Sequence, residues 1–311
     1  MAKRDFRTVM DFSRDEMMNI FALTAKIKEN PQAYSQALAG KSLAMINEKQ
    51  SLRTKVTFLA GAQQLGGHSV YLTNQDISLG KREPVKDVAR NLARWVDIIV
   101  ARVFQQSSIT ELAKYADIPV INALSDEEHP CQVVADVYTL WDQLRKRENM
   151  DDFHLTFVGD GNNVCNSLIL ISALVGMRIT VCTPPGYEPD PRIVRQGREL
   201  AHANGGAVTF EVDPRKAVNE TDAIYTDVWT SMGQEAESEK RLQDFKMYQV
   251  NEDLLSWSTG DVVIMHCLPA HRGEEITDEV LESKHSLVFD QAENRLHAQK
   301  AIMKFLLDAS S

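Results

Sequence analysis

Short apolar runs alternate with amphipathic stretches along almost the whole chain, and this alternation restricts the fold more than any other feature. The runs 42–46 and 98–103 have the length of buried strands, whereas 84–96 repeats its apolar positions at helical spacing. Strands that alternate with helices are typical of parallel sheets whose faces are covered by helices. We therefore predict an α/β fold class, with mainly parallel sheets flanked by helices.

A polar stretch at 148–152 interrupts the alternation, which then starts again. A chain of 311 residues is long enough for two domains. We predict similar domains at 1–147 and 148–290, and a C-terminal helix at 291–311 that returns to the first domain. The predicted strands are 42–46, 69–72, 98–103, 119–122, 155–158, 179–182, 208–212, 223–225, 262–265 and 287–289; the clearest predicted helices are 84–96, 130–147 and 291–307.

The charges argue against a polyanionic partner. The net charge of −10 comes from 44 acidic and 34 basic side chains that are mixed along the chain. Nucleic acids and anionic membranes attract basic surfaces, so neither is an expected partner. The four cysteines form no C-x-x-C pair, and no long apolar run is present at the N-terminus or elsewhere. We expect a cytoplasmic protein with reduced thiols, in which any anionic substrate is held by local arginines.

One helix start has the residues of a phosphate site. Ser51, Leu52, Arg53 and Thr54 follow a predicted strand and open an apolar-periodic helix. Ser51 is a natural N-cap, the first turn offers free N–H groups, and a guanidinium matches phosphate in a bidentate way. The alternative is a capped surface helix with solvated charges, and this segment alone does not decide between the two.

A glycine-rich turn, Gly159 to Asn163, follows another predicted strand. It lacks the third glycine of a dinucleotide fingerprint, because Val164 stands there, and no acidic residue ends the next strand. We therefore predict no nicotinamide cofactor. The turn either places the Asn163 amide at the carboxyl edge of the sheet, where ligands bind in such folds, or has a purely structural role.

Further polar segments follow predicted strands. His129 and Gln132 flank a helix-starting proline, so the histidine either donates to a substrate carbonyl or caps the helix. Asp227 opens a long polar loop, of the kind that compact domains usually keep for function. The adjacent His266 and Cys267 suggest a metal, but the ligand spacings of zinc sites are absent, and we predict none.

Read in order, these segments resemble the signature of the aspartate/ornithine carbamoyltransferase family, and in particular of its ornithine enzymes. The resemblance extends from Leu38 to Arg295. It implies transfer of a carbamoyl group from carbamoyl phosphate to the side-chain amine of L-ornithine, without a cofactor, in a homotrimer or stacked trimers. The segments that carry it are 51–54, 129–132, 159–163, 227–233 and 266–269.

The resemblance also assigns roles. It implies that the first domain binds carbamoyl phosphate and the second binds the amino acid. The amine must lose a proton before attack, at a cost of roughly 4 to 5 kcal/mol at neutral pH, and whether Asp227 or Cys267 accepts it stays open. The implied carbamoyl phosphate-binding residues are Ser51, Leu52, Arg53, Thr54, Arg102, His129, Gln132, Cys267, Leu268 and Arg295; the ornithine-binding residues are Asn163, Asp227, Ser231 and Met232; the catalytic residues are Arg102, His129, Asp227, Cys267 and Arg295.

Three positions depart from the pattern. Relatives commonly carry arginine where Lys55 stands and glutamate where Leu59 stands, and histidine or glutamine in place of Ser78. These changes keep a catalytically silent homologue among the alternatives, beside a carbamoyltransferase for another amine such as putrescine. Aspartate is disfavoured as acceptor, because the loop after Asp227 offers an acid where a second carboxylate would need a cation.

Overall fold

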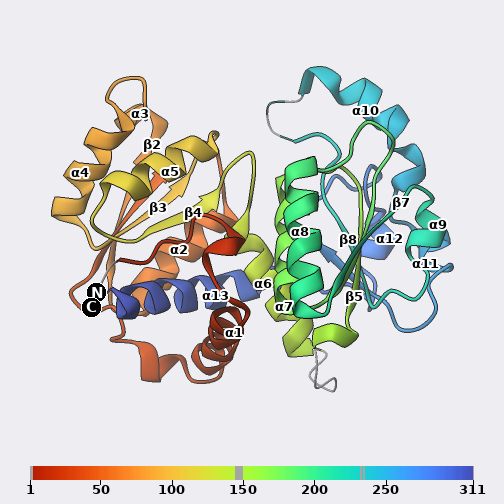
Figure 1. Ribbon diagram of the computed structural model, residues 1–311, viewed down its shortest axis with the longest axis horizontal. Coiled ribbons are helices and arrows are strands. Elements are labelled where there is room, and N and C mark those ends of the chain that lie inside the picture. Colours follow the sequence, from red (N-terminus) through yellow and green to blue (C-terminus); the bar gives the residue numbers. More distant parts are fainter. Residues whose placement is uncertain (1–2, 144–149, 232, 234, 311) are drawn as a thin grey trace. The chain divides into compact units, whose positions relative to one another are not determined.

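The computed structural model describes residues 3–143, 150–231, 233 and 235–310. The chain forms two compact units, one made of residues 1–138 and 293–311 and the other of residues 139–292. Each unit contains one sheet with helices on its faces (Figure 1). The predicted α/β fold class is confirmed. None of the helices described is both long enough and apolar enough to cross a lipid bilayer.

The sheet of the first unit has four parallel strands in the order β2-β1-β3-β4. Chain order reverses between β1 and β3, so their carboxyl ends form the switch point where ligands bind in open α/β sheets. The strands are β1 (Ser42–Asn47), β2 (His68–Thr73), β3 (Ile98–Arg102) and β4 (Val120–Leu124). The helices are η1 (Val9–Asp11), α1 (Arg14–Glu29), η2 (Pro31–Tyr34), α2 (Arg53–Gln64), α3 (Asn74–Ile77), α4 (Val85–Trp95), α5 (Gln106–Tyr115), α6 (Pro130–Gln143) and α13 (Val288–Ala309), the last two crossing the unit boundary.

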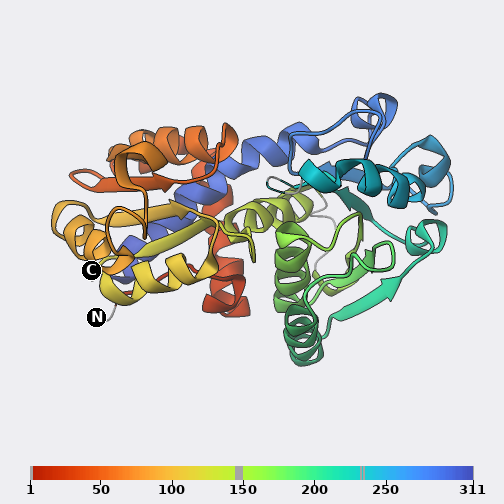
Figure 2. The ribbon, with the colours of Figure 1, turned by 90° about the horizontal axis from the view of Figure 1, so that it is seen from above.

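Two layers of helices enclose this sheet. Successive residues of a strand point to opposite faces, and Ala44 and Ile46 of β1 share one core with the apolar sides of α4 and α5. That core explains the helical spacing seen at 84–96, since Val88 and Leu92 are buried in it. α2 and α13 lie together on the opposite face (Figure 2).

The sheet of the second unit has five parallel strands in the order β7-β6-β5-β8-β9. Its switch point lies between β5 and β8. In Figure 1, α7 and α8 cover one face, and α9, α11 and α12 lie on the other. The strands are β5 (His154–Val158), β6 (Arg178–Cys182), β7 (Ala207–Glu211), β8 (Ala223–Thr226) and β9 (Val263–His266). The helices are η3 (Met150–Asp152), α7 (Asn163–Val175), α8 (Pro191–Asn204), α9 (Pro214–Ala217), η4 (Glu235–Glu237), α10 (Ser238–Asp244), η5 (Lys246–Tyr248), α11 (Glu252–Leu255) and α12 (Asp278–Leu281).

One predicted element is wrong. The segment 287–289 was expected to be a strand, but helix α13 already begins at Val288. Ser286 forms only an isolated bridge with Ile264, and the Leu287 N–H donates to the Ile264 carbonyl at 2.9 Å before the chain turns into the helix. A short apolar run at the start of a buried helix has the same local pattern as a strand, which explains the error.

Candidate functional site

In the first unit, the predicted phosphate segment lies at the switch point of the sheet. The N–H of Thr54 donates to the Ser51 hydroxyl at 3.1 Å, as a capping serine would accept it. The helix itself begins at Arg53, so Leu52 rather than Ser51 occupies the formal cap position, and 72% of Leu52 is exposed. The first turn of α2 therefore presents its N–H groups at the carboxyl edge of β1.

Arg102, the last residue of β3, reaches the same edge. Its Nε donates to the Lys49 carbonyl at 3.3 Å, and its Nη2 donates to the Gln50 carbonyl at 3.4 Å. Lys49 is itself buried, forms an ion pair with Asp126 and lies 4.7 Å from the centre of the Phe104 ring. Lys49 was not among the predicted site residues, although its position two residues before Ser51 could have indicated that it lies near the phosphate segment.

Arg295 of α13 joins residues that are distant in sequence. This buried guanidinium donates to the Thr54 hydroxyl at 3.1 Å and to the Gln132 side-chain oxygen. Gln132 in turn donates to Asp136 at 2.8 Å. In the amide orientation that satisfies both neighbours, the Gln299 oxygen also accepts from Arg295. The predicted residues Thr54, Gln132 and Arg295 are thus brought into direct contact.

His129 lies among these cations. Burial lowers the pKa of its imidazole well below the ordinary value, and the positive charges of Arg295, Arg102, Arg53 and Lys49 lower it further. We call Lys49, Arg53, Arg102 and Arg295 around His129 the cationic cluster. The imidazole of His129 is neutral at physiological pH, so one ring nitrogen carries a proton that it can donate. The positive charge of the cluster around it attracts an anion.

In the second unit, Asp227 follows β8 at the other switch point. Its carboxylate is buried and accepts from the Asn162 amide at 2.7 Å, the Val228 N–H at 2.8 Å and the Cys267 thiol at 2.9 Å. Asn162 also caps α7 by accepting from the N–H groups of Val164 and Cys165. Asn162, in the glycine-rich turn, therefore both orients the Asp227 carboxylate and caps the start of α7.

Asp160, in the same turn, carries a perturbed carboxyl group. Burial raises its pKa to about 6, although the nearby Arg241 guanidinium opposes the rise. Arg241 pairs with Asp160 at 3.0 Å, with Glu237 at 3.2 Å, and donates to the Trp229 carbonyl at 2.8 Å. Sequence reasoning missed this pair, because nothing in the local pattern around Arg241 distinguishes it from a surface arginine.

The remaining predicted residues have simpler descriptions. Asn163 is the first residue of α7, and Ser231 is half-buried in the loop after β8. Met232 lies outside the described residues. Two of the positions that depart from the family pattern are also placed. The Lys55 ammonium lies 3.8 Å from the centre of the Tyr71 ring, and Ser78 follows the last residue of α3 in a left-handed conformation with φ of 43°.

Two groups of side chains in the described part of the second unit have metal-ligand atoms close together. Asp227, His266 and Cys267 form one, and His271, Glu274 and Glu275 form the other. Hydrogen bonds already engage both ring nitrogens of His266: Nε2 faces Glu275 at 3.0 Å, and Nδ1 accepts from the Leu268 N–H at 2.8 Å. The second bond holds Leu268 in a left-handed conformation with φ of 59° and so shapes the loop beside Cys267.

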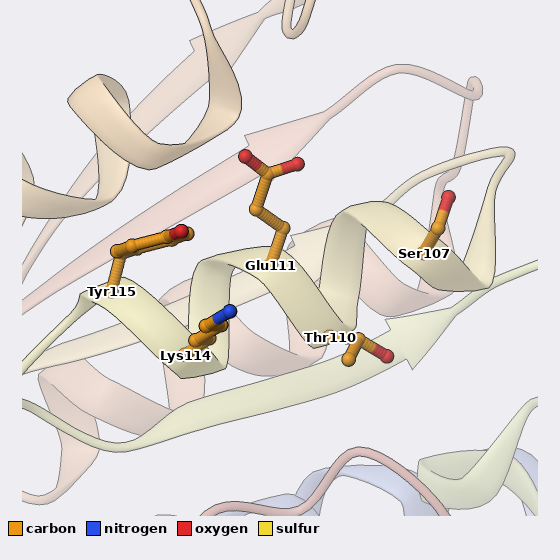
Figure 3. A pocket seen from close by; sticks show the side chains of 5 residues that line it. All are labelled: Ser107, Thr110, Glu111, Lys114 and Tyr115. Atoms are coloured by element: carbon orange, nitrogen blue, oxygen red, sulfur yellow. The ribbon is translucent and has the colours of Figure 1, made fainter.

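A shallow pocket of about 380 Å³ lies along α5 and is lined by Ser107, Thr110, Glu111, Lys114 and Tyr115 (Figure 3). None of the predicted site residues lines it. The chemistry-bearing side chains therefore lie elsewhere, at the carboxyl ends of the strands.

Comparison with known protein families decides the affiliation. The carbamoyl-P binding domain of aspartate/ornithine carbamoyltransferases matches residues 4–142, and the Asp/Orn binding domain matches residues 151–306. The chain belongs to the aspartate/ornithine carbamoyltransferase family. Within this family, it is 52% identical to an ornithine carbamoyltransferase of Archaeoglobus fulgidus, over 98% of this chain and 97% of the relative.

Solved structures of the family have the same fold. An ornithine carbamoyltransferase from Pyrococcus furiosus superposes with a TM-score of 0.93 at 46% identity, covering 97% of this chain and 96% of that one. An anabolic ornithine carbamoyltransferase from Campylobacter jejuni superposes with a TM-score of 0.94 at 35% identity, covering 98% of this chain and 99% of that one. The resemblance seen in the sequence is confirmed at the level of the family.

Proposed function

We propose that this protein is an ornithine carbamoyltransferase, which transfers the carbamoyl group of carbamoyl phosphate to the side-chain amine of L-ornithine and releases citrulline and phosphate. The family membership and the names of its relatives support the activity. Among the contacts, the cationic cluster carries the proposal, because it offers an anion the buried guanidinium groups of Arg102 and Arg295, the half-buried one of Arg53 and a neutral histidine.

The first domain, 1–147, binds carbamoyl phosphate. Ser51, Leu52, Arg53 and Thr54 hold the phosphate with backbone N–H groups, hydroxyls and a guanidinium, as an anion at a helix N-terminus is held. Arg102 donates to both the phosphate and the carbonyl oxygen, His129 donates to the carbonyl oxygen, and Arg295 adds a further donor, as negative charge develops on that oxygen during attack by the amine. Gln132 and the backbone carbonyls of Cys267 and Leu268 accept from the carbamoyl NH₂.

The second domain, 148–290, binds ornithine. Asn163, Ser231 and Met232 fix the α-ammonium and α-carboxylate, and Asp227 with Cys267 orients the side-chain amine. The amine nitrogen forms a bond to the carbamoyl carbon, the bond from that carbon to the phosphate oxygen breaks, and phosphate leaves with the electron pair. The proton of the amine goes to Asp227 directly, or it goes to the Cys267 sulfur as the thiol passes its own proton to Asp227 along their contact at 2.9 Å.

The assembly and the compartment belong to the proposal as well. The protein acts without a cofactor in the cytoplasm, as a homotrimer or as stacked trimers, and residues 291–311 return to the first domain. Size-exclusion chromatography with light scattering measures the oligomer directly, and a monomer that forms citrulline at full rate would contradict the assembly.

A colorimetric assay for the ureido group, which citrulline and the other possible products share, tests the activity with ornithine, putrescine and aspartate offered in parallel. Product from ornithine alone supports the proposal, product from another amine changes the acceptor, and no product from any of them favours a catalytically silent homologue. Arg53→Ala and Arg102→Ala each remove a charge from the cationic cluster and should abolish turnover. Arg90→Ala is the matched control, because Arg90 is an exposed arginine of the same unit whose guanidinium contacts Asp87 at 3.4 Å and lies 4.9 Å from the centre of the Tyr115 ring.

A further inference from the structure

The N-terminal segment is attached to the loop that carries His129. Phe6 pairs with Ile121 of β4: the Phe6 N–H donates to the Val120 carbonyl at 2.8 Å, and the Asn122 N–H donates to the Phe6 carbonyl at 2.7 Å. The segment then turns into η1, where Thr8 is the cap. Residues 6–9 thus lie beside the edge strand that leads directly into residues 125–129.

The contact at the end of this segment involves a buried carboxylate. Glu128 is 2% exposed; one of its oxygens accepts from the Thr8 hydroxyl and the other accepts from the Val9 N–H at 3.2 Å. Burying a carboxylate is unfavourable unless its oxygens are hydrogen-bonded, and these two donors tie Glu128 to the N-terminal segment. His129 is the next residue in the chain.

A second set of bonds closes the loop from its other side. The Ser125 N–H donates to the Glu128 carbonyl at 2.8 Å, and the Glu128 N–H donates to the Ser125 hydroxyl at 3.1 Å. The same hydroxyl donates to the Gln106 amide oxygen at 2.6 Å, and the Gln106 amide donates to the Arg7 carbonyl at 3.2 Å. The loop is therefore tied to the N-terminal segment through both the backbone and the side chain of Glu128.

We propose that Glu128 is a positioning residue for His129: by binding Thr8 and Val9, its carboxylate holds the loop and thereby aims the imidazole into the cationic cluster. The inference rests on the proposed function for the role of His129, but the contact itself does not. Phosphate binding depends on Ser51, Arg53 and Thr54, which this contact does not touch. Loosening the loop should therefore impair the chemical step and leave phosphate affinity almost unchanged.

The test uses Thr8→Val, which removes the donor while keeping the shape, and Glu128→Leu, which removes both acceptors. Glu128→Gln is the conservative rescue, because its amide oxygen can accept from the Val9 N–H while its NH₂ donates to the Thr8 hydroxyl, which reverses the direction of that one bond. Misplacing a catalytic group by about 1 Å costs up to roughly a hundredfold in rate, so we expect kcat to fall roughly tenfold or more in the first two variants. The dissociation constant of inorganic phosphate, measured by calorimetry, should stay within about twofold of wild type. Thr110→Val, an exposed threonine of α5 (Figure 3), is the matched control.

A second readout does not depend on activity. Diethyl pyrocarbonate labels accessible neutral imidazoles, and peptide mass spectrometry follows each histidine separately. Labelling of buried His129 should accelerate several-fold in Thr8→Val and Glu128→Leu, whereas labelling of exposed His202 should not change. An unchanged His129 rate in both variants overturns the inference whatever their kcat. If wild-type protein forms no citrulline, the proposed function fails, and the labelling rate still decides whether Glu128 positions His129.

Discussion

Lys300 of α13 is a buried cation whose removal should stabilise the protein. The residue is 2% exposed, and its ammonium donates to the side-chain oxygen of Gln64 at 2.8 Å. Within the described part of the chain, no carboxylate lies within ion-pair distance of that ammonium. Burial lowers the pKa of Lys300, which means that the fold disfavours its charged form. The variant Lys300→Met replaces the cation by an apolar side chain of similar length.

The expected gain follows from two opposing contributions. Burying an unpaired cation costs several kcal/mol, and one hydrogen bond to a neutral amide returns about 1 kcal/mol. Gln64 is exposed, so its amide can bind water after the substitution. The stem contacts are kept, including the close packing of the Lys300 Cγ near Gly61. We expect Lys300→Met to raise the free energy of unfolding by about 2 kcal/mol, or the melting temperature by roughly 4–8 °C for a unit of about 150 residues.

Urea and thermal unfolding of both proteins measure the difference, and pH supplies a further check. A lysine with a lowered folded-state pKa is penalised below that pKa, and the penalty disappears as pH rises towards the unfolded value. The advantage of Lys300→Met should therefore shrink at alkaline pH. Lys304→Met is the control: Lys304 pairs with Asp308 at 2.8 Å on the surface of the same helix, so its loss should change stability by less than about 1 kcal/mol. A destabilised Lys300→Met protein would refute the reasoning.

Two further predictions concern the glycine-rich turn. Gly161→Ala should destabilise the second unit by about 2 kcal/mol or more in urea unfolding, because a Cβ there would lie 2.3 Å from the Pro189 nitrogen and only backbone atoms could move to relieve the clash. Gly186→Ala is the control, because no atom lies within 4 Å of a Cβ at that position. It should cost only the strain of its positive φ, about 1 kcal/mol. Because the folded protein raises the pKa of Asp160 to about 6, it binds the proton of this carboxyl group more tightly than the unfolded chain does. The free energy of unfolding should therefore be highest below about pH 4 and should fall by about 3 kcal/mol as the pH rises through 6. Unfolding measured from pH 4 to 7 should show this fall in wild type relative to Asp160→Asn, and parallel pH curves for the two proteins would contradict it.

Much of the candidate site could be predicted from local sequence. A buried strand followed at once by polar residues is visible in a window of about ten residues, and parallel strands bring their carboxyl ends to one edge. This is why Ser51 and Asp227 were predicted as candidate site residues before any contact was known. The family signature, spread over nearly the whole chain, predicted Arg102, His129 and Arg295 as well.

The tertiary structure alone decided which side chains meet. Arg295 reaches Thr54 across 241 positions of sequence, and Glu128 reaches Thr8 across 120. Local periodicity reports only whether a position is buried. The partner of a buried polar group depends on strand order and on which helix covers which face, and no short window contains either. Lys300 is a further example, because a lysine in a helical sequence pattern is expected to be exposed to solvent. It is buried here only because α13 packs against α2.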